Sequence, residues 1–169
     1  MNQNKPSLVI MGVAGCGKSS LGAAVATQAW LKLVEGDDHH SAESLTKMRS
    51  GVPLTDEDRN GWLAAISREI SKQPDGLVVT CSALKLVYRE RLRRAAPGLL
   101  FVYLDISRAQ ALARVTERAA SHFFSTSLVD SQFAILEPPT LEAGVLRVDA
   151  LAPIEQQKAQ VCTWLATQS

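Results

Sequence analysis

The sequence predicts an α/β fold in which a doubly wound, parallel five-stranded sheet lies between two layers of helices. Five short, mostly apolar runs alternate with segments of helical pattern, and this alternation is typical of β-α-β units. A glycine-rich segment joins the first apolar run directly to the first helical segment. At 169 residues the chain has the length of one domain, which we expect to span 1–169.

The individual elements follow from these patterns in order. Strands are expected at 7–11, 31–34, 77–81, 100–104 and 145–148. Helices are expected between them and after the last one, at 18–29, 56–72, 85–96, 108–120, 128–136 and 154–166. Thr55 and Asp58 have the spacing of a helix start, and Pro97-Gly98 ends the helix before the fourth strand. Trp30, Trp62 and Trp164 lie in or beside apolar helices and are expected to pack.

Charge and hydropathy point to a small partner. The formal net charge is +1 with acidic and basic residues interspersed, which gives no field for nucleic acid or for a membrane surface. No apolar run approaches the roughly 20 residues of a membrane helix, and the polar first residues lack the apolar core of a signal peptide. We therefore expect a cytoplasmic protein. Cys16, Cys81 and Cys162 are odd in number and far apart, which predicts reduced thiols without a disulfide or zinc.

A complete phosphate loop follows the first expected strand. The motif G-x-x-x-x-G-K-[ST] is filled by Gly12-Val13-Ala14-Gly15-Cys16-Gly17-Lys18-Ser19. Its glycines let backbone N–H groups turn towards phosphate oxygens, and the next helix presents its positive end to the same anion. A glycine-rich turn that matches by chance is the alternative, which the flanking strand and apolar helix disfavour. The motif predicts binding of a nucleoside triphosphate in a P-loop NTPase fold.

Roles within the loop follow from its chemistry. We expect Lys18 to reach the β- and γ-phosphates and Ser19 to ligate Mg²⁺. The predicted ATP-binding residues of the loop are Gly12, Val13, Ala14, Gly15, Cys16, Gly17, Lys18, Ser19 and Ser20. A thiol near a helix N-terminus can have a lowered pKa, so oxidation of Cys16 is one hypothesis. The favoured alternative is that Cys16 is an inert side chain that fills space.

Polar residues follow the second and third expected strands, where a parallel sheet binds its ligands. Asp37 is the first choice for a carboxylate that orients an acceptor hydroxyl, accepts its proton or holds Mg²⁺ through water. An exposed helix cap is the other interpretation of Asp37. His40 has the chemistry to bond a polyol hydroxyl, although a lone histidine is more often a solvated surface group. Ser82 and Lys85 follow the third strand, and Arg89 lies on the next helix.

Several segments together make the chain resemble the gluconate kinase (gluconokinase) family of small P-loop kinases. The resemblance covers residues 8 to about 149. Its more specific parts are Gly36-Asp37-Asp38 with His40, Leu54-Thr55-Asp56-Glu57-Asp58-Arg59 and Cys81-Ser82-Ala83-Leu84-Lys85. Ser131-Gln132-Phe133 and Leu136-Glu137-Pro138-Pro139 also carry the resemblance. The phosphate loop alone fits many proteins, so these other segments decide the assignment.

This resemblance implies an adenylate- or shikimate-kinase-like fold and a reaction. Proteins of this family phosphorylate the 6-hydroxyl of D-gluconate with ATP and Mg²⁺ and release 6-phospho-D-gluconate and ADP; they are expected to form homodimers. Gluconate carries one carboxylate and many hydroxyls, which suits a pocket with a few cations and polar side chains. The expected substrate-binding residues are Asp37, His40, Arg59, Ser82, Lys85 and Arg89.

A mobile lid is expected at about 114–127. Arg114 and Arg118 are four residues apart and share a helix face that leads into a polar, aromatic segment at 121–127, where Phe123 and Phe124 would pack. Two guanidinium groups there would close over the phosphates and neutralise developing charge, with Arg118 preferred. An ion-pair face with Glu117 is the alternative. The expected catalytic residues are therefore Lys18, Asp37 and Arg118.

The chain departs from the family pattern at a few positions. Ser41 and Ser44 replace the usual Pro and Asn, Gly61 replaces the usual Pro before Trp62, and His39 and Ala143 are also unusual. An Asn side chain can donate and accept hydrogen bonds at a distance that the shorter Ser44 side chain does not reach. Details of the acceptor site therefore stay open. Two other functions also stay open: a kinase for another small acid such as shikimate or a different sugar acid, and a nucleotide-binding module that has lost catalysis.

Overall fold

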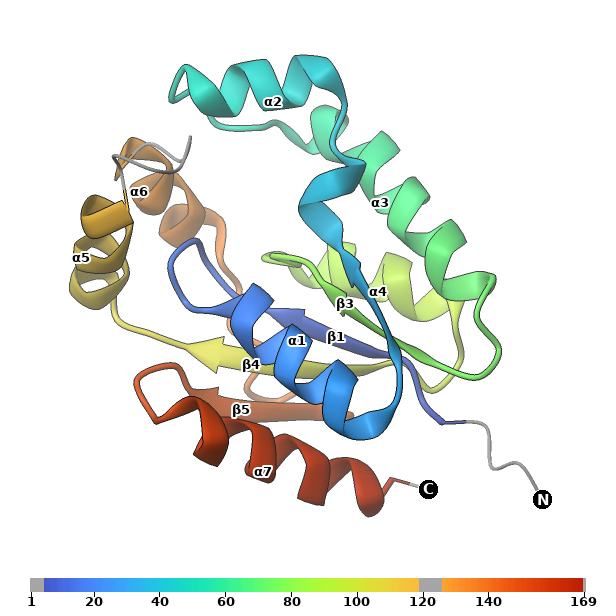
Figure 1. The fold of residues 1–169 in the computed structure, drawn as a ribbon. Coiled ribbons are helices and arrows are strands. Elements are labelled where there is room, and N and C mark those ends of the chain that lie inside the picture. The colour runs from blue at the N-terminus through green and yellow to red at the C-terminus, as the bar shows by residue number, and fades with distance from the viewer. Residues whose placement is uncertain (1–4, 119–125, 169) are drawn as a thin grey trace.

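The computed structural model describes residues 5–118 and 126–168 and contains a five-stranded parallel sheet (Figure 1). The strands are β1 (Leu8–Met11), β2 (Lys32–Glu35), β3 (Leu77–Thr80), β4 (Leu100–Asp105) and β5 (Val145–Asp149). Their order across the sheet is β2-β3-β1-β4-β5. Each neighbouring pair is parallel, so all the carboxyl ends lie at the same edge of the sheet. The predicted fold class and all five strands are confirmed, with ends shifted by a residue or so.

The helices of the described part of the chain cover both faces of the sheet (Figure 1). They are α1 (Lys18–Ala29), the 3-10 helix η1 (Gly36–His39), α2 (Ala42–Arg49), α3 (Asp56–Ser71), α4 (Leu86–Ala95), α5 (Arg108–Arg118), α6 (Thr126–Ile135) and α7 (Ile154–Ala166). No helix in the described ranges is both long enough and apolar enough to cross a membrane.

Two buried clusters result from the alternation of side chains along each strand. Leu8 and Ile10 of β1 belong to the cluster that includes the buried faces of α1, α5 and α7. Val9 and Met11 belong to the cluster that includes α3 and α4. Successive side chains of a strand point to opposite faces, so a strand covered on both sides is apolar throughout. Burial on both faces explains why the sequence of β1 is a continuous apolar run.

Helix α2 was not predicted from the sequence. Only Ser44 and Met48 of its residues are buried, so it shows no clear apolar period. Its start is marked instead by the Ser41 side chain, which accepts a hydrogen bond from the Ser44 backbone N–H at 3.1 Å. The Ser41 and Ser44 hydroxyls also lie 3.1 Å apart. The two departures from the family pattern therefore cap α2 in this chain.

The expected packing of the tryptophans holds only in part. Trp62 is buried and Trp164 packs against the core, but Trp30 is 89% exposed. Trp30 ends α1 in the left-handed conformation with φ 56°, which turns its side chain away from the sheet. Residues 119–125 lie outside the described residues. They include the end of the predicted helix 108–120, Phe123, Phe124 and half of the expected lid.

Candidate active site

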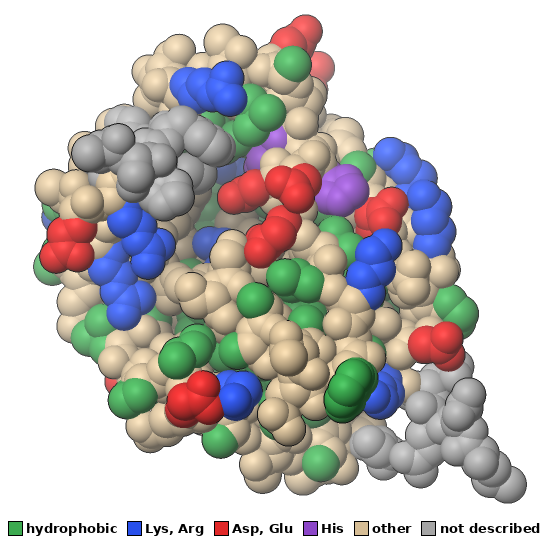
Figure 2. Space-filling model, viewed as in Figure 1, with side chains coloured by type: hydrophobic (Ala, Val, Ile, Leu, Met, Phe, Trp, Pro, Cys, Tyr) green, Lys and Arg blue, Asp and Glu red, His purple; other side chains and the backbone are tan. Residues whose placement is uncertain are grey.

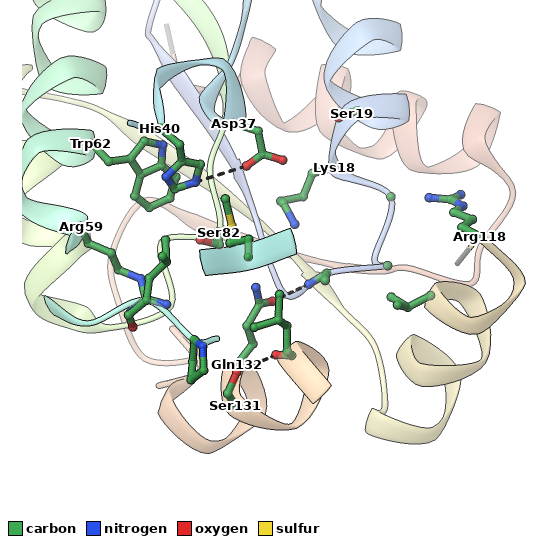
Figure 3. Close-up of a pocket in the computed structure, with 18 of the residues that line it drawn as sticks. Lys18, Ser19, Asp37, His40, Arg59, Trp62, Ser82, Arg118, Ser131 and Gln132 are labelled. Carbon is green, nitrogen blue, oxygen red and sulfur yellow. Dashed lines mark hydrogen bonds and ion pairs between the residues drawn. The ribbon is translucent and has the colours of Figure 1, made fainter. Parts of the chain in front are cut away.

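A pocket lies at the carboxyl edge of the sheet, between the phosphate loop, the segment from η1 to α3, and helices α5 and α6 (Figure 3). In the space-filling view, acidic side chains and Lys or Arg side chains border this hollow (Figure 2). It is lined by Ala14, Gly15, Gly17, Lys18, Ser19, Ser20, Asp37, His40, Met48, Pro53, Leu54, Arg59, Trp62, Ser82, Val115, Arg118, Leu128, Ser131 and Gln132. Most of the predicted site residues are therefore brought together, although they come from segments far apart in the sequence.

The phosphate loop has a backbone that glycine allows. Gly15 has φ 81°, and a Cβ added there would lie 3.0 Å from the carbonyl oxygen of Ala111 in α5. Lys18 extends back across the loop, where its Nζ donates to the carbonyl oxygens of Gly12 and Val13 at 3.0 Å each. This arrangement holds a primary ammonium group beside the backbone that is expected to surround phosphates.

Cys16 is fully enclosed within the loop. Its side chain is 1% exposed, and burial raises the pKa of its thiol, although Lys18 nearby acts in the opposite direction. A raised pKa leaves little thiolate at neutral pH, and the thiolate is the reactive form. The structure therefore contradicts the hypothesis of a lowered pKa and supports Cys16 as an inert side chain that fills space.

Oxygen atoms gather beside Ser19 at the first turn of α1. The Ser19 hydroxyl donates to Oε2 of Glu35 at 3.0 Å, and the Thr80 hydroxyl donates to the same oxygen at 2.5 Å. Glu35 ends β2, so its carboxylate is fixed by the sheet. Hydroxyl and carboxylate oxygens are the ligands that Mg²⁺ prefers, so this donor set fits the cation expected at Ser19. Sequence reasoning gave Glu35 no role, because Asp37 was the first choice for the carboxylate after the second strand.

Asp37 and His40 form the wall opposite the phosphate loop (Figure 3). The Asp37 side chain is 64% exposed, and its Oδ1 lies 3.7 Å from Nε2 of His40. The His40 ring stacks on Trp62 with centroids 4.4 Å apart and an interplanar angle of 15°. Trp62 in turn donates from Nε1 to the carbonyl oxygen of Gly36 at 2.7 Å. The Trp62 ring thus supports His40 from behind, which the expectation of simple packing did not include.

The surroundings of the His40 ring disfavour its charged form. Burial lowers the pKa of His40, with Asp37 acting in the opposite direction. Its Nδ1 is buried and has no hydrogen-bond partner among the described residues. A buried polar atom without a partner is costly, and the residue that carries it lines the pocket. The interpretation of His40 as a solvated surface group is therefore wrong.

The three expected substrate cations lie in different surroundings. Arg59 of α3 lines the pocket, is 8% exposed and donates from Nη1 to the Leu54 carbonyl oxygen at 2.6 Å. Lys85 lies outside the lining and is bonded to both carboxylate oxygens of Asp56, at 2.9 and 3.1 Å. The structure therefore brings Arg59, and not Lys85, into the pocket.

Arg89 also lies outside the pocket, contrary to expectation. Its side chain is 1% exposed, and its five N–H groups are engaged by Glu142 and by the carbonyl oxygens of Ala83, Leu84 and Glu137. No donor is left for a ligand. Ala83 has a left-handed φ of 45°, so Arg89 stabilises a strained turn directly after Ser82. As placed here, Arg89 shapes the pocket from behind.

The two expected lid arginines are also separated. Arg118 ends α5 and lines the pocket. Arg114 donates instead to the carbonyl oxygens of Gly15 at 3.2 Å and Ala150 at 3.0 Å. It therefore binds the backbone of the phosphate loop from outside, and only Arg118 faces the pocket as the lid hypothesis requires.

Helix α6 contributes residues to which sequence reasoning gave no role. Leu128, Ser131 and Gln132 line the pocket, and Oε1 of Gln132 accepts a hydrogen bond from the Ala14 N–H at 2.7 Å. The available signal was their spacing, because residues at i, i+3 and i+4 share one helix face. The neighbouring Ser127 hydroxyl donates to the Gly51 carbonyl oxygen at 3.3 Å, which links α6 to the segment after α2.

Comparisons with known proteins agree with this architecture. A family model described as shikimate kinase matches residues 14–130. The chain is 40% identical over 147 residues to the thermosensitive gluconokinase of Escherichia coli strain K12, covering 85% of this chain and 78% of that protein. It is 42% identical over 144 residues to the gluconokinase of Gluconobacter oxydans strain 621H, covering 83% of this chain and 80% of that protein.

A solved structure extends the likeness to three dimensions. The crystal structure of a gluconokinase from Sinorhizobium meliloti 1021 has a TM-score of 0.89 to this chain at 41% identity, covering 97% of this chain and 93% of that one. The sequence relatives cover 83–85% of this chain, and the solved structure covers 97% of it. The chain thus belongs to the gluconokinase family of P-loop kinases.

Proposed function

We propose that this protein transfers the γ-phosphoryl group of ATP to the 6-hydroxyl of D-gluconate and releases 6-phospho-D-gluconate and ADP. The observation that carries the proposal is a single pocket with a phosphate loop on one side and Asp37, His40 and Arg59 on the other. Such a pocket places a triphosphate and a small hydroxy acid next to each other. Phosphoryl transfer requires that positioning, together with stabilisation of charge, more than covalent assistance.

The nucleotide side has three proposed contributors. Backbone N–H groups of the phosphate loop other than that of Ala14, which donates to Gln132, bind phosphate oxygens. Lys18 leaves its two carbonyl partners to bind the β- and γ-phosphates. Mg²⁺ neutralises charge on the phosphates when it is bound. Ser19 and Glu35, whose side chains are bonded to each other, would hold this cation. Arg118 approaches from α5 and stabilises the charge that develops during transfer.

The acceptor side orients the nucleophile. The 6-hydroxyl oxygen attacks the γ-phosphorus, the bond from that phosphorus to the β–γ bridging oxygen breaks, and the hydroxyl proton passes to Asp37. The Asp37 side chain is 64% exposed, and its carboxylate oxygen is the acceptor for this proton. His40 and Ser82 bind other hydroxyls, and Arg59 binds the substrate carboxylate as a charge-assisted donor.

The experiment is a substrate panel that measures ADP release by the purified protein with ATP and Mg²⁺. The acceptors are D-gluconate, other sugar acids, glycerate, shikimate and none. We expect a rate with D-gluconate well above the rate without acceptor. Shikimate is the informative rival because the matching family model is described by that name. Turnover confined to shikimate or another acid would refute gluconate as the substrate, and tight ATP binding without turnover of any acceptor would indicate a non-catalytic module.

A further inference from the structure

Helix α6 connects the nucleotide side of the pocket directly to the acceptor side. Gln132 is bonded to the Ala14 N–H of the phosphate loop, while Leu128 and Ser131 on the same helix face line the pocket. The Ala14 N–H can only donate, so the atom of the Gln132 amide that faces it must be the oxygen, Oε1. This hydrogen bond fixes the direction of the amide group, so Nε2 lies on the side of the amide that faces away from the Ala14 N–H.

The Nε2 group of Gln132 is directed into the pocket. Figure 3 shows its nitrogen pointing away from the loop, towards the space between Ser82 and Lys18. No hydrogen bond from Nε2 occurs among the residues that the structure describes, whereas Oε1 is engaged at 2.7 Å. An amide held at its oxygen presents two N–H donors at a set distance from the phosphate loop.

We propose that Gln132 is a specificity-determining residue whose Nε2 donates to a hydroxyl oxygen of the bound acceptor. This inference rests on the proposed kinase function. Ser82 and Ser131, which flank this part of the pocket, are neutral hydroxyl-bearing side chains suited to a polyol. The loop's own amides and Lys18 supply the donors for phosphate. Because Oε1 is anchored on Ala14, Gln132 sets the distance between the acceptor hydroxyl and the loop that holds the transferring phosphoryl group.

Two variants separate the anchor from the donor. Gln132→Glu keeps an oxygen that can accept from the Ala14 N–H but replaces the Nε2 donor with a second oxygen. Gln132→Met has a similar length and no charge, and it removes both functions. Gln160→Met is the matched control, because Gln160 is an exposed glutamine of α7 that bonds the Arg147 carbonyl oxygen outside the pocket.

The decisive measurement is calorimetric binding of D-gluconate in the presence of a non-hydrolysable ATP analogue, together with steady-state KM and kcat for D-gluconate. We expect both Gln132 variants to raise the Kd and KM for D-gluconate about tenfold, the effect of losing one hydrogen bond worth roughly 1.4 kcal/mol. The Kd of the ATP analogue in the uncharged Met variant should stay within about threefold of wild type. The Gln160→Met control should match wild type in its KM and Kd for D-gluconate and in its Kd for the ATP analogue.

Other results would overturn the role of Gln132. An unchanged Kd for D-gluconate in either variant would leave Gln132 as a structural residue only. A rise in the Kd of the ATP analogue in Gln132→Met, without a rise for D-gluconate, would assign the donor to the nucleotide. If Gln132→Met fails to fold, Gln132→Glu decides alone, since it keeps the anchor. Wild-type protein that binds no D-gluconate would refute the proposed function and this inference together, whereas wild-type turnover with unchanged variants would refute only the inference.

Discussion

The two sides of the pocket are built in different ways. The phosphate loop is one uninterrupted segment, residues 12–19, whose geometry follows from its glycines and from the strand and helix that flank it. The acceptor wall is assembled from η1, α3, the turn after β3 and α6, which are separated by tens of residues in the sequence. A contiguous site can be identified from a motif, while an assembled site depends on which of several candidate side chains the packing turns inwards.

The arginines illustrate this difference most clearly. Arg59 and Arg89 both lie on helices near the pocket and are both buried. Arg59 lines the pocket, but Arg89 is enclosed by Glu142 and three carbonyl oxygens. Their chemistry is the same, so only the neighbours distinguish a ligand-facing guanidinium from a structural one. The following variants test the comparison, beginning with the largest expected effect.

Lys18→Met, in the phosphate loop, should lower activity more than any other variant proposed here. Removal of the ammonium group takes away a charge that neutralises the phosphates in the ground state and during transfer, so we expect kcat/KM to fall by roughly a thousandfold or more. The Kd of ATP should also rise. Lys158→Met, at a lysine of α7 paired with Glu155, is the control and should behave as wild type. Retention of both ATP affinity and rate in Lys18→Met would overturn the nucleotide assignment.

Asp37→Asn tests the acceptor wall of the pocket by removing only the charge of one side chain. We expect kcat to fall by about a hundred- to ten-thousandfold, because an amide cannot accept the hydroxyl proton. The Kd of ATP should change less than threefold, since Asp37 lies across the pocket from the loop. Asp38→Asn, at the exposed neighbouring residue, provides the control. Near-normal turnover of Asp37→Asn in a steady-state assay would remove Asp37 from the mechanism.

Arg89→Met and Arg59→Met should give opposite results. Loss of Arg89 leaves three carbonyl oxygens without their donor and removes one of the two arginines that bind Glu142, the other being Arg93. We expect a loss of about 3–5 kcal/mol in the free energy of unfolding. Arg59→Met should instead raise the KM for D-gluconate about tenfold with a smaller loss of stability. Urea denaturation and steady-state kinetics measure the two effects. A stable Arg89→Met variant with a raised KM would show that Arg89 contacts the substrate.

The smallest expected effect concerns the connection between α2 and α3. A hydrogen bond from Lys47, with further bonds from Thr55, lowers the pKa of Asp58 from its ordinary value to about 2. The folded state thus binds the proton more weakly than the unfolded chain, so the contribution of Asp58 to stability is present above about pH 4 and is lost as the pH falls to about 2.

Asp58→Asn provides the comparison for this pH dependence. The difference between the urea midpoints of wild type and Asp58→Asn should be largest at pH 5 and should shrink between pH 4 and pH 2. Thr46→Ala, at an exposed position of α2, controls for general acid sensitivity of this segment. A difference that stays constant over this range would mean that Asp58 has an ordinary pKa in the folded protein.

The sequence by itself determined the parts of this protein whose structure depends on near neighbours. The alternation of apolar runs and helical patterns predicted all five strands, because a strand covered on both faces must be apolar along its length. The phosphate loop was predicted from eight consecutive residues for a similar reason: its glycines and the helix that follows are enough to turn backbone N–H groups inwards. Asp37, His40, Arg59 and Ser82, which were predicted to bind the substrate, line the pocket.

Only the tertiary structure decided which polar side chains are partnered. It enclosed Arg89 and Arg114 within backbone carbonyl groups, paired Lys85 with Asp56, and placed Glu35 beside Ser19. It also supported His40 with Trp62 and brought Gln132 of α6 against the phosphate loop, 118 residues away in sequence. A charged or amide side chain has the same sequence signature whether it faces a ligand or a neighbour, because its role depends on long-range contacts that no local pattern records.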